Sequence, residues 1–192
     1  MPDIGLHNTV VVTIFCLTVL VCMLSRQPFN RYTVTILAAF ALSIILNSGP
    51  VLRSLHIVHD DQYMTIQVFD AANDTERYLH INSTNASGIY TDPTKEETLF
   101  PTLDYIEKQF IYSRKANAPP LDILMIGAGG FALGLNDAKN NYTYIDIDPK
   151  LKDVAETEFL QRKLGPNKKF VPEEARAFLA TSKEKFDLIV LD

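Results

Sequence analysis

Hydrophobic and polar residues follow three successive patterns along this chain of 192 residues. Two long uncharged apolar runs come first, at 8–25 and 32–52. A segment in which apolar and polar residues alternate follows, and from Leu121 onward short apolar runs alternate with longer mixed ones. These patterns divide the chain into three predicted domains: 1–52, 53–118 and 119–192.

The first domain is predicted to be a pair of membrane helices. Each apolar run approaches or reaches the roughly 20 residues that a helix needs to cross a bilayer core. The first run lacks the basic N-terminal region of a signal peptide, and a second run follows it directly. We therefore expect residues 1–52 to form a transmembrane helical hairpin in a multi-pass membrane protein. Two buried helices of a soluble protein are the alternative.

The second domain is predicted to be a small antiparallel β-domain. The stretches "QYMTIQVFD" and "ERYLHIN" alternate with a period of two, which is typical of half-buried strands, and "AAND" supplies a turn between them. The next stretch, "STNASG", is predicted to turn the chain. The stretch "TLFPTLDYIEKQFIY" follows and predicts one helix, with Leu103, Ile106 and Phe110 on one face.

The third domain repeats a strand–helix pattern. Its predicted strands are "LDILMIG", "YTYIDID", "KKFV" and "FDLIVLD", and its predicted helices are "FALGLNDAKNN", "PKLKDVAETEFLQRKLG" and "EEARAFLATS". Nearly all-apolar strands that alternate with helices predict an α/β fold with an open parallel sheet, Rossmann-like and of the methyltransferase type. A complete sheet of this class continues beyond a fourth strand. We therefore expect either that the chain is a fragment or that a partner chain completes the sheet.

Candidate ligand-binding residues follow the first two strands of this domain. Open parallel sheets bind ligands at the carboxyl ends of their strands. The stretch "ILMIGAGGFALGL" places Gly127, Gly129 and Gly130 directly after the first strand, where missing Cβ atoms allow a ligand to approach the backbone. The second strand ends in Asp146 and Asp148, about 20 residues later, where a carboxylate suits the two hydroxyls of a ribose.

The third strand leads to Glu173 and Glu174, which are placed to meet the edge of an adenine. The glycine pattern "GAGGFA" lacks the third glycine of a dinucleotide fingerprint, and no basic residue is placed to bind a pyrophosphate. We therefore predict a ligand with a nucleoside and no phosphate, such as S-adenosylmethionine or a relative.

Charge and composition exclude several other classes of function. From Arg53 onward the chain has 16 Lys and Arg (18 − 2) against 22 Asp and Glu (23 − 1), an acidic balance that argues against nucleic acid as a partner. Both cysteines fall in the first apolar run, so the rest of the chain has no cysteine site for zinc. His56 and His59 stand near two aspartates but lack a third ligand with convincing spacing, so we predict no metal.

The order of these pieces resembles the polyamine aminopropyltransferases, the spermidine synthase family, over roughly 62–192. The motifs "ILMIGAGG", "YIDIDP", "EEARAFL" and "FDLIVLD" match, in order, that family's glycine loop, ribose-binding acid, adenine-side acid and active-site strand. The apolar segment in front also resembles the membrane-anchored or fused members.

This resemblance implies a role for each matched residue. Asp146 would hold the ribose hydroxyls and Glu174 the adenine amino group of decarboxylated S-adenosylmethionine. Asp192 would be the catalytic carboxylate that takes a proton from the attacking amine, such as putrescine, because an amine is a nucleophile only when it is neutral. The expected activity is therefore aminopropyl transfer to a small-molecule amine.

The chain also departs from the family at the residues that recognise amines. Gly130 stands where the family has an aspartate for the aminopropyl ammonium, and Ala86 and Ser87 stand for a Gln-Ser pair. The family's Tyr-His/Gln-Glu motif is read here as 100–102, "FPT". These differences leave two alternatives open: an S-adenosylmethionine-dependent methyltransferase, and a non-catalytic membrane protein with a nucleoside-binding domain.

The predicted ligand also affects the expected location. Arg26 and Arg31 between the two apolar runs favour a cytoplasmic loop there, which would put the remaining domains outside. Cofactors of this class are made and kept in the cytoplasm, and two arginines discriminate poorly. We therefore expect the soluble domain to lie in the cytoplasm, at a membrane. A second copy of this chain, in a homodimer, is one candidate for a protein partner.

Overall fold

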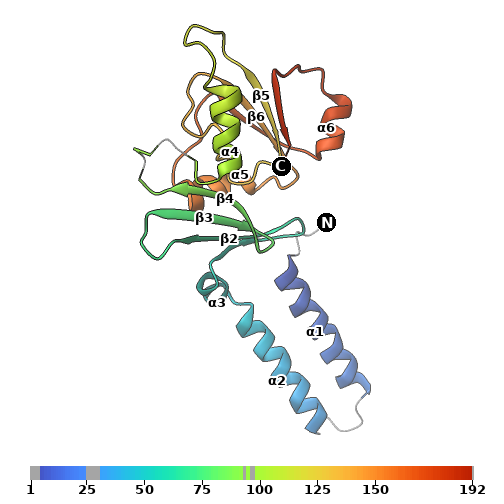
Figure 1. The fold of residues 1–192 in the computed structure, drawn as a ribbon. Helices are drawn as coiled ribbons and strands as arrows, with labels where there is room; N and C mark the ends of the chain where they lie inside the picture. The colour runs from blue at the N-terminus through green and yellow to red at the C-terminus, as the bar shows by residue number, and fades with distance from the viewer. Residues whose placement is uncertain (1–4, 25–30, 93, 96–97, 192) are drawn as a thin grey trace. The chain divides into compact units, whose positions relative to one another are not determined.

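The computed structural model describes residues 5–24, 31–92, 94–95 and 98–191. The chain forms two compact units, Met1–Gln67 and Val68–Asp192. Figure 1 shows the helices of the first unit and the sheets of the chain. The two units are described separately below.

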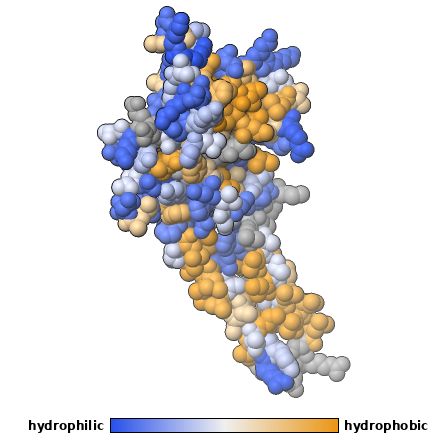
Figure 2. Space-filling model, in the orientation of Figure 1, coloured by the Kyte–Doolittle hydropathy of each residue, from blue (hydrophilic) through white to orange (hydrophobic). Residues whose placement is uncertain are grey.

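Two apolar helices dominate the first unit, α1 (Leu6–Leu24) and α2 (Arg31–Leu46). They pack against each other, with the rings of Phe15 and Phe40 at 5.5 Å between centroids. Many of their large apolar side chains are exposed, and Figure 2 shows these side chains along both helices. An apolar surface of this kind fits a bilayer or another apolar partner rather than water.

The predicted transmembrane hairpin is not supported by these helices. One described helix, at His7–Leu24, is long and apolar enough to cross a membrane, by length and composition only. The second apolar helix has 16 residues, because Asn47 and Ser48 form a turn before Gly49 and Pro50 start the short helix α3 (Gly49–Ser54). The sequence-based prediction had counted this turn and the start of α3 as part of one uncharged run.

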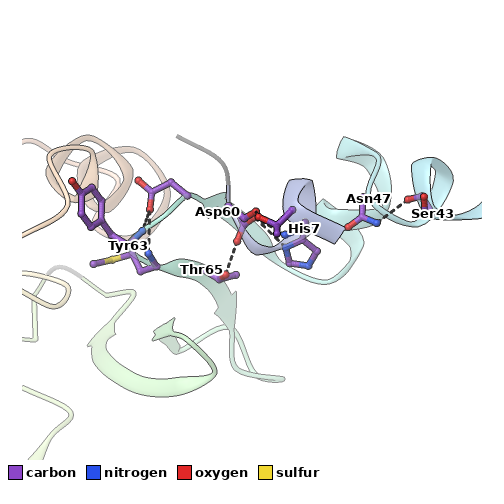
Figure 3. Close-up of polar contacts among 10 residues, drawn as sticks. His7, Ser43, Asn47, Asp60, Tyr63 and Thr65 are labelled. Carbon is purple, nitrogen blue, oxygen red and sulfur yellow. Dashed lines mark hydrogen bonds and ion pairs between the residues drawn. The ribbon is translucent and has the colours of Figure 1, made fainter. Parts of the chain in front are cut away.

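A carboxylate from β1 (Ile57–Asp60) caps the start of α1 within the first unit. Asp60 Oδ2 accepts a hydrogen bond from the His7 backbone N–H at 3.1 Å, and the His7 Nδ1 atom lies 3.3 Å from the same oxygen (Figure 3). The other oxygen accepts a hydrogen bond from the Thr65 hydroxyl at 2.6 Å. A carboxylate at a helix N-terminus satisfies a free N–H and interacts favourably with the helix dipole.

The predicted β-domain is present, with two strands more than expected, β1 and β4 (Thr84–Tyr90). Its sheet has the order β1-β2-β3-β4, with β2 at Thr65–Asp70 and β3 at Glu76–Ile81. Strands β3 and β4 pair antiparallel around Asn82 and Ser83, which both have positive φ, as a two-residue hairpin turn requires. The predicted turn "STNASG" was therefore wrong, since 84–88 belong to β4.

The predicted parallel sheet lies in the second unit. Its strands are β5 (Asp122–Ile126), β6 (Asn141–Asp146), β7 (Lys168–Pro172) and β8 (Leu188–Leu191), paired in parallel in the order β7-β6-β5-β8. All four predicted strands are confirmed. Helix α6 (Ala175–Thr181) packs Phe178 against Leu124 and Ile145 of this sheet.

Two further helices of the second unit each end in a turn of π-helix. Helix α4 (Pro101–Ile106) continues as η1 (Glu107–Ile111), and α5 (Leu151–Val154) continues as η2 (Ala155–Phe159). The predicted helix "FALGLNDAKNN" is wrong, because 131–140 form turns. Asp137 captures the backbone N–H groups of Lys139 and Asn140 with its side chain, which replaces helical hydrogen bonds.

Candidate functional site

The glycine loop at 127–130 joins the ends of two neighbouring strands. Gly127 and Gly129 have φ values of 86° and 50°, a region that favours glycine. The Gly127 N–H donates to the Ile145 carbonyl at 2.9 Å, and the Ala128 N–H donates to Asp146 Oδ2 at 3.0 Å. The loop and the end of β6 therefore form one hydrogen-bonded edge of the parallel sheet.

Asp146 is central to this edge. Burial raises the pKa of its carboxyl, and the backbone N–H groups of Ala128 and Asp148 act against that rise. These two groups bind different carboxylate oxygens, at 3.0 Å and 3.4 Å. A carboxylate has about four lone-pair sites, so each oxygen can still accept a hydroxyl hydrogen bond. The geometry is compatible with the predicted ribose role, which stays a prediction.

Asp148 has a local structural role beside Asp146. Its side chain is buried, and its Oδ1 atom accepts a hydrogen bond from the Lys150 backbone N–H at 2.8 Å. Its carbonyl accepts a hydrogen bond from the Leu151 N–H at 3.2 Å. These bonds form the turn that leads from β6 into α5 and hold the end of β6 in place.

Glu174 lies at the same edge and caps α6. Its carboxylate accepts hydrogen bonds from the Ala177 backbone N–H and the Arg176 Nε, both at 3.0 Å, and the bond from Arg176 holds the pKa of Glu174 below its usual value. The Glu173 N–H donates to the Asp146 carbonyl at 2.9 Å, which brings the segment after β7 to the end of β6. The predicted adenine contact of Glu174 stays a prediction.

The predicted catalytic residue, Asp192, lies outside the described residues. The residue before it, Leu191, pairs with Ile126, which directly precedes the glycine loop. Strand β8 therefore runs to the same edge of the sheet as Gly127 and Asp146. The chain topology gathers the predicted glycine, ribose-side and adenine-side residues at one edge.

Gly130 is closely packed on both sides. A Cβ atom at this position would lie 2.6 Å from Ser87 Cβ and 2.7 Å from Ser87 Oγ, and it would also meet the Phe159 ring. Gly129 is nearby, and a Cβ there would lie 3.3 Å from the Ala86 carbonyl oxygen. Strand β4 therefore lies directly against the glycine loop, a contact that no sequence signal had indicated.

Phe131, which follows the loop, is fully buried although its φ is 59°. Its ring meets those of Tyr144 and Phe170 edge-on, at 5.0 Å and 5.4 Å between centroids. A bulky residue at positive φ is strained, and aromatic packing offsets that strain here. Because Phe131 packs into the core, it fixes where the glycine loop ends.

No metal ligand set was predicted, and one of the two histidines named for such a set, His59, contacts a neighbouring aspartate. His59 Nε2 lies 3.2 Å from Asp61 Oδ2 in the first unit. Burial raises the pKa of Asp61, but backbone donors at Tyr63 and Met64 and the nearby His59 outweigh it, so its pKa is lowered. The prediction of no metal remains a prediction.

Comparisons with known proteins show similarity in structure only. No family model and no curated protein matches this chain. A probable spermidine synthase from Corynebacterium glutamicum ATCC 13032 matches with a TM-score of 0.57 and 18% identity, over 68% of this chain and 49% of that one.

Two more solved structures match with TM-scores below 0.5. A spermidine synthase in complex with the transition-state analogue AdoDATO has a TM-score of 0.45 and 15% identity, over 71% of this chain and 46% of that one. Spermidine synthase from Thermotoga maritima has a TM-score of 0.44 and 16% identity, over 68% and 45%.

The chain spans about half the length of the solved structures that it matches. The fold assignment rests on the Corynebacterium structure, whose TM-score exceeds 0.5. In fold, an antiparallel sheet followed by a methyltransferase-like parallel sheet, this chain is similar to that probable spermidine synthase.

Proposed function

We propose that this protein is an aminopropyltransferase, which moves the aminopropyl group of decarboxylated S-adenosylmethionine to an amine such as putrescine. The observation that carries the proposal is the hydrogen-bonded edge formed by the glycine loop and Asp146. A loop of small residues beside a carboxylate suits a nucleoside, because the backbone can approach it and the carboxylate can accept ribose hydroxyls.

The proposed reaction is a displacement at carbon. The sulfonium co-substrate supplies an aminopropyl carbon with a neutral thioether as leaving group. The amine nitrogen forms a bond to that carbon, the carbon–sulfur bond breaks, and 5′-methylthioadenosine leaves with the electron pair. The amine then loses a proton, for which we propose Asp192 as the acceptor. The protein's main task is to position two reactants, since the leaving group needs no acid.

We propose that Asp146 and Glu174 orient the nucleoside in this reaction. Asp146 can accept ribose hydroxyls because its oxygens keep free lone pairs. Glu174 keeps its charge, because its pKa is lowered, and a carboxylate can accept a hydrogen bond from an adenine amino group. We place this unit in the cytoplasm, and we propose that α1 attaches the protein to a membrane.

A second candidate function, methyl transfer from S-adenosylmethionine, is favoured by the packing at Gly130. The family resemblance implies an aspartate there that binds the aminopropyl ammonium. Here Ser87 and the Phe159 ring occupy the space that its side chain would need. A site without that carboxylate has less reason to prefer the decarboxylated form over S-adenosylmethionine, which carries a carboxylate of its own.

Calorimetric titration of the full chain with each of the two sulfonium compounds tests the proposal. We expect binding of the decarboxylated form, loss of at least tenfold in affinity for Asp146→Asn, and no change for Asp122→Asn. Asp122 is a matched control, because it is an exposed carboxylate at the opposite end of the neighbouring strand. Mass spectrometry after incubation with putrescine should then show spermidine and 5′-methylthioadenosine.

The other outcomes separate the alternatives. Preferential binding of S-adenosylmethionine, with no spermidine formed, would replace aminopropyl transfer by methyl transfer. If neither compound bound to the folded chain, the catalytic proposals would be wrong. The reading of a non-catalytic membrane protein would then remain.

A further inference from the structure

A cavity lies in the Val68–Asp192 unit, and none of the predicted site residues that the structure describes lines it. Its volume is about 370 Å³, near the lower end of the range of roughly 300–1,000 Å³ that is usual for small-molecule sites. Its lining comes from Arg77 on β3, from β4 and described residues of the segment 91–98 that follows it, from the turns after the glycine loop, from the start of η1 and from the residues that follow η2.

The carboxylate of Glu107 is one of two charged groups in this cavity on which the argument rests. Glu107 is only 4% exposed. Its Oε1 atom accepts a hydrogen bond from the Gly134 backbone N–H at 2.7 Å. Among the described residues, no hydrogen bond to its Oε2 atom is seen, and this oxygen is not fully enclosed. A ligand that supplies an ammonium N–H would therefore be stabilised there by a charge-assisted hydrogen bond.

The second charged group is the guanidinium of Arg162. It is exposed at the rim and donates to the Asn136 side-chain oxygen at 2.7 Å. It forms no ion pair with a carboxylate among the residues that the structure describes. Arg77, which also lines the cavity, differs because Asp70 neutralises it in a bidentate pair. Lys95 also lines the cavity, with its Nζ atom 4.3 Å from the centroid of the Tyr90 ring. Among the lining guanidinium groups, Arg162 is the one that no described carboxylate neutralises, and it can bind a carboxylate with two parallel hydrogen bonds, which the Lys95 ammonium cannot.

Apolar residues form part of the cavity lining, beside polar residues such as Thr91 and Gln161. Ile89, Ala132, Leu135 and Leu160 all line the same cavity. They offer no charge, so they suit methylene groups rather than further polar atoms. A cavity lined by a carboxylate, an unneutralised guanidinium and apolar residues can accept a ligand that carries an ammonium, a carboxylate and methylene groups.

We propose that this cavity binds a small aminocarboxylate, with its ammonium on Glu107 and its carboxylate on Arg162. Charge-assisted hydrogen bonds of both kinds are among the strongest polar contacts in proteins, and the guanidinium can bind a carboxylate with two parallel bonds. The proposal does not depend on the proposed aminopropyl transfer, since none of the described residues assigned to that reaction lines this cavity.

The charged neighbours of Glu107 are consistent with a cationic ligand. Burial raises its pKa to about 7, the Gly134 N–H acts against this rise, Asp104 and Asp137 add to it, and Lys108 lowers it slightly. Tyr144 from β6 also faces it. An ammonium stabilises the ionised form, so aminocarboxylate binding should release a proton near neutral pH and become tighter from pH 6 to pH 8.

The test is titration of the full chain with a series of unbranched aminocarboxylates, namely glycine, 4-aminobutanoate and 6-aminohexanoate. Butylamine and butanoate serve as probes with only one charge. We expect at least one member of the series to bind tenfold or more tightly than either single-charge probe. Saturation-transfer NMR detects weak binding, and calorimetry in two buffers measures the released proton.

Variants then assign the two ends. Glu107→Gln and Arg162→Gln should each weaken binding at least tenfold, and Glu107→Gln should remove the pH dependence. Lys169→Gln is the control, since Lys169 is an exposed cation paired with Glu184 outside the cavity. Arg162 is on the surface, so its variant should fold even if Glu107→Gln does not. The proposal is wrong if no member of the series binds, if a single-charge probe binds equally well, or if Arg162→Gln leaves affinity unchanged.

Discussion

Replacement of Glu107 by glutamine should make the free energy of unfolding less dependent on pH. Glutamine has the same shape and can still accept the hydrogen bond from Gly134 through its side-chain oxygen. It removes only the titrating carboxyl group. The variant therefore separates the effect of burying a charge from the effect of losing a contact.

The magnitude follows from the pKa of Glu107, which burial raises from 4.5 to about 7 in the folded protein. The folded state then binds this proton more tightly than the unfolded state does. The stabilisation is fully present below about pH 4.5 and is lost as the pH rises through about 7. The whole change corresponds to about 3 kcal/mol, at 1.36 kcal/mol for each tenfold change in proton affinity.

Urea unfolding of the full chain at pH 5, 6, 7 and 8, followed by circular dichroism, measures this effect. We expect the difference in free energy between Glu107→Gln and the wild type to shift by about 2.5 kcal/mol in favour of the variant across this range, because part of the change lies below pH 5. Glu184→Gln, at an exposed ion pair, serves as the control and should show no such shift. If Glu107→Gln and the wild type kept a constant difference at every pH, the argument for a buried titrating carboxyl would be refuted.

Three further substitutions test the packing that holds these sites. Gly134→Ala should cost about 2–4 kcal/mol, because φ is 66° there and the Tyr142 ring occupies the place of a Cβ, whereas Gly49→Ala, with open space around it, should change the melting temperature little. Asp137→Ala should cost about 2–3 kcal/mol, because it leaves the buried Tyr142 hydroxyl without its acceptor at 2.7 Å; unchanged urea denaturation would contradict this. Asp60→Ala should cost about 1 kcal/mol locally and speed hydrogen exchange at the first turn of α1, and unaltered exchange would show that the cap is unimportant.

The strands of the parallel sheet could be predicted because their burial is visible in the sequence. Residues of β5 and β6 such as Leu124 and Tyr144 are buried inside the sheet, so nearly every position is apolar or aromatic. The carboxyl ends of those strands could then be located, and with them the candidate site. A parallel sheet brings these ends to one edge whatever the loops do.

Strand β4 could not be predicted, for a physical reason. Its positions 87 and 88 are small because other parts of the unit approach them closely. A Cβ at Gly88 would lie 3.1 Å from Leu99 and 3.3 Å from Tyr78, and Ser87 packs on Gly130. Small residues required by close contact remove the alternating apolar signal of a strand. The turns after Phe131 were missed because Asp137 takes the backbone N–H groups of Lys139 and Asn140, a local arrangement that the hydrophobic pattern does not reveal.

Position 130 shows why a motif comparison and a structure carry different information. In the sequence, Gly130 is only a position where the aspartate of the resembled family is missing. In the structure, the space for that aspartate is filled from two elements, by Ser87 on β4 and by Phe159 at the end of η2. Packed interiors cannot accept the four extra heavy atoms of an aspartate side chain without displacing their neighbours. The departure at position 130 is therefore built into the contact between strand and loop, and any ammonium-binding group at this edge has to come from another position.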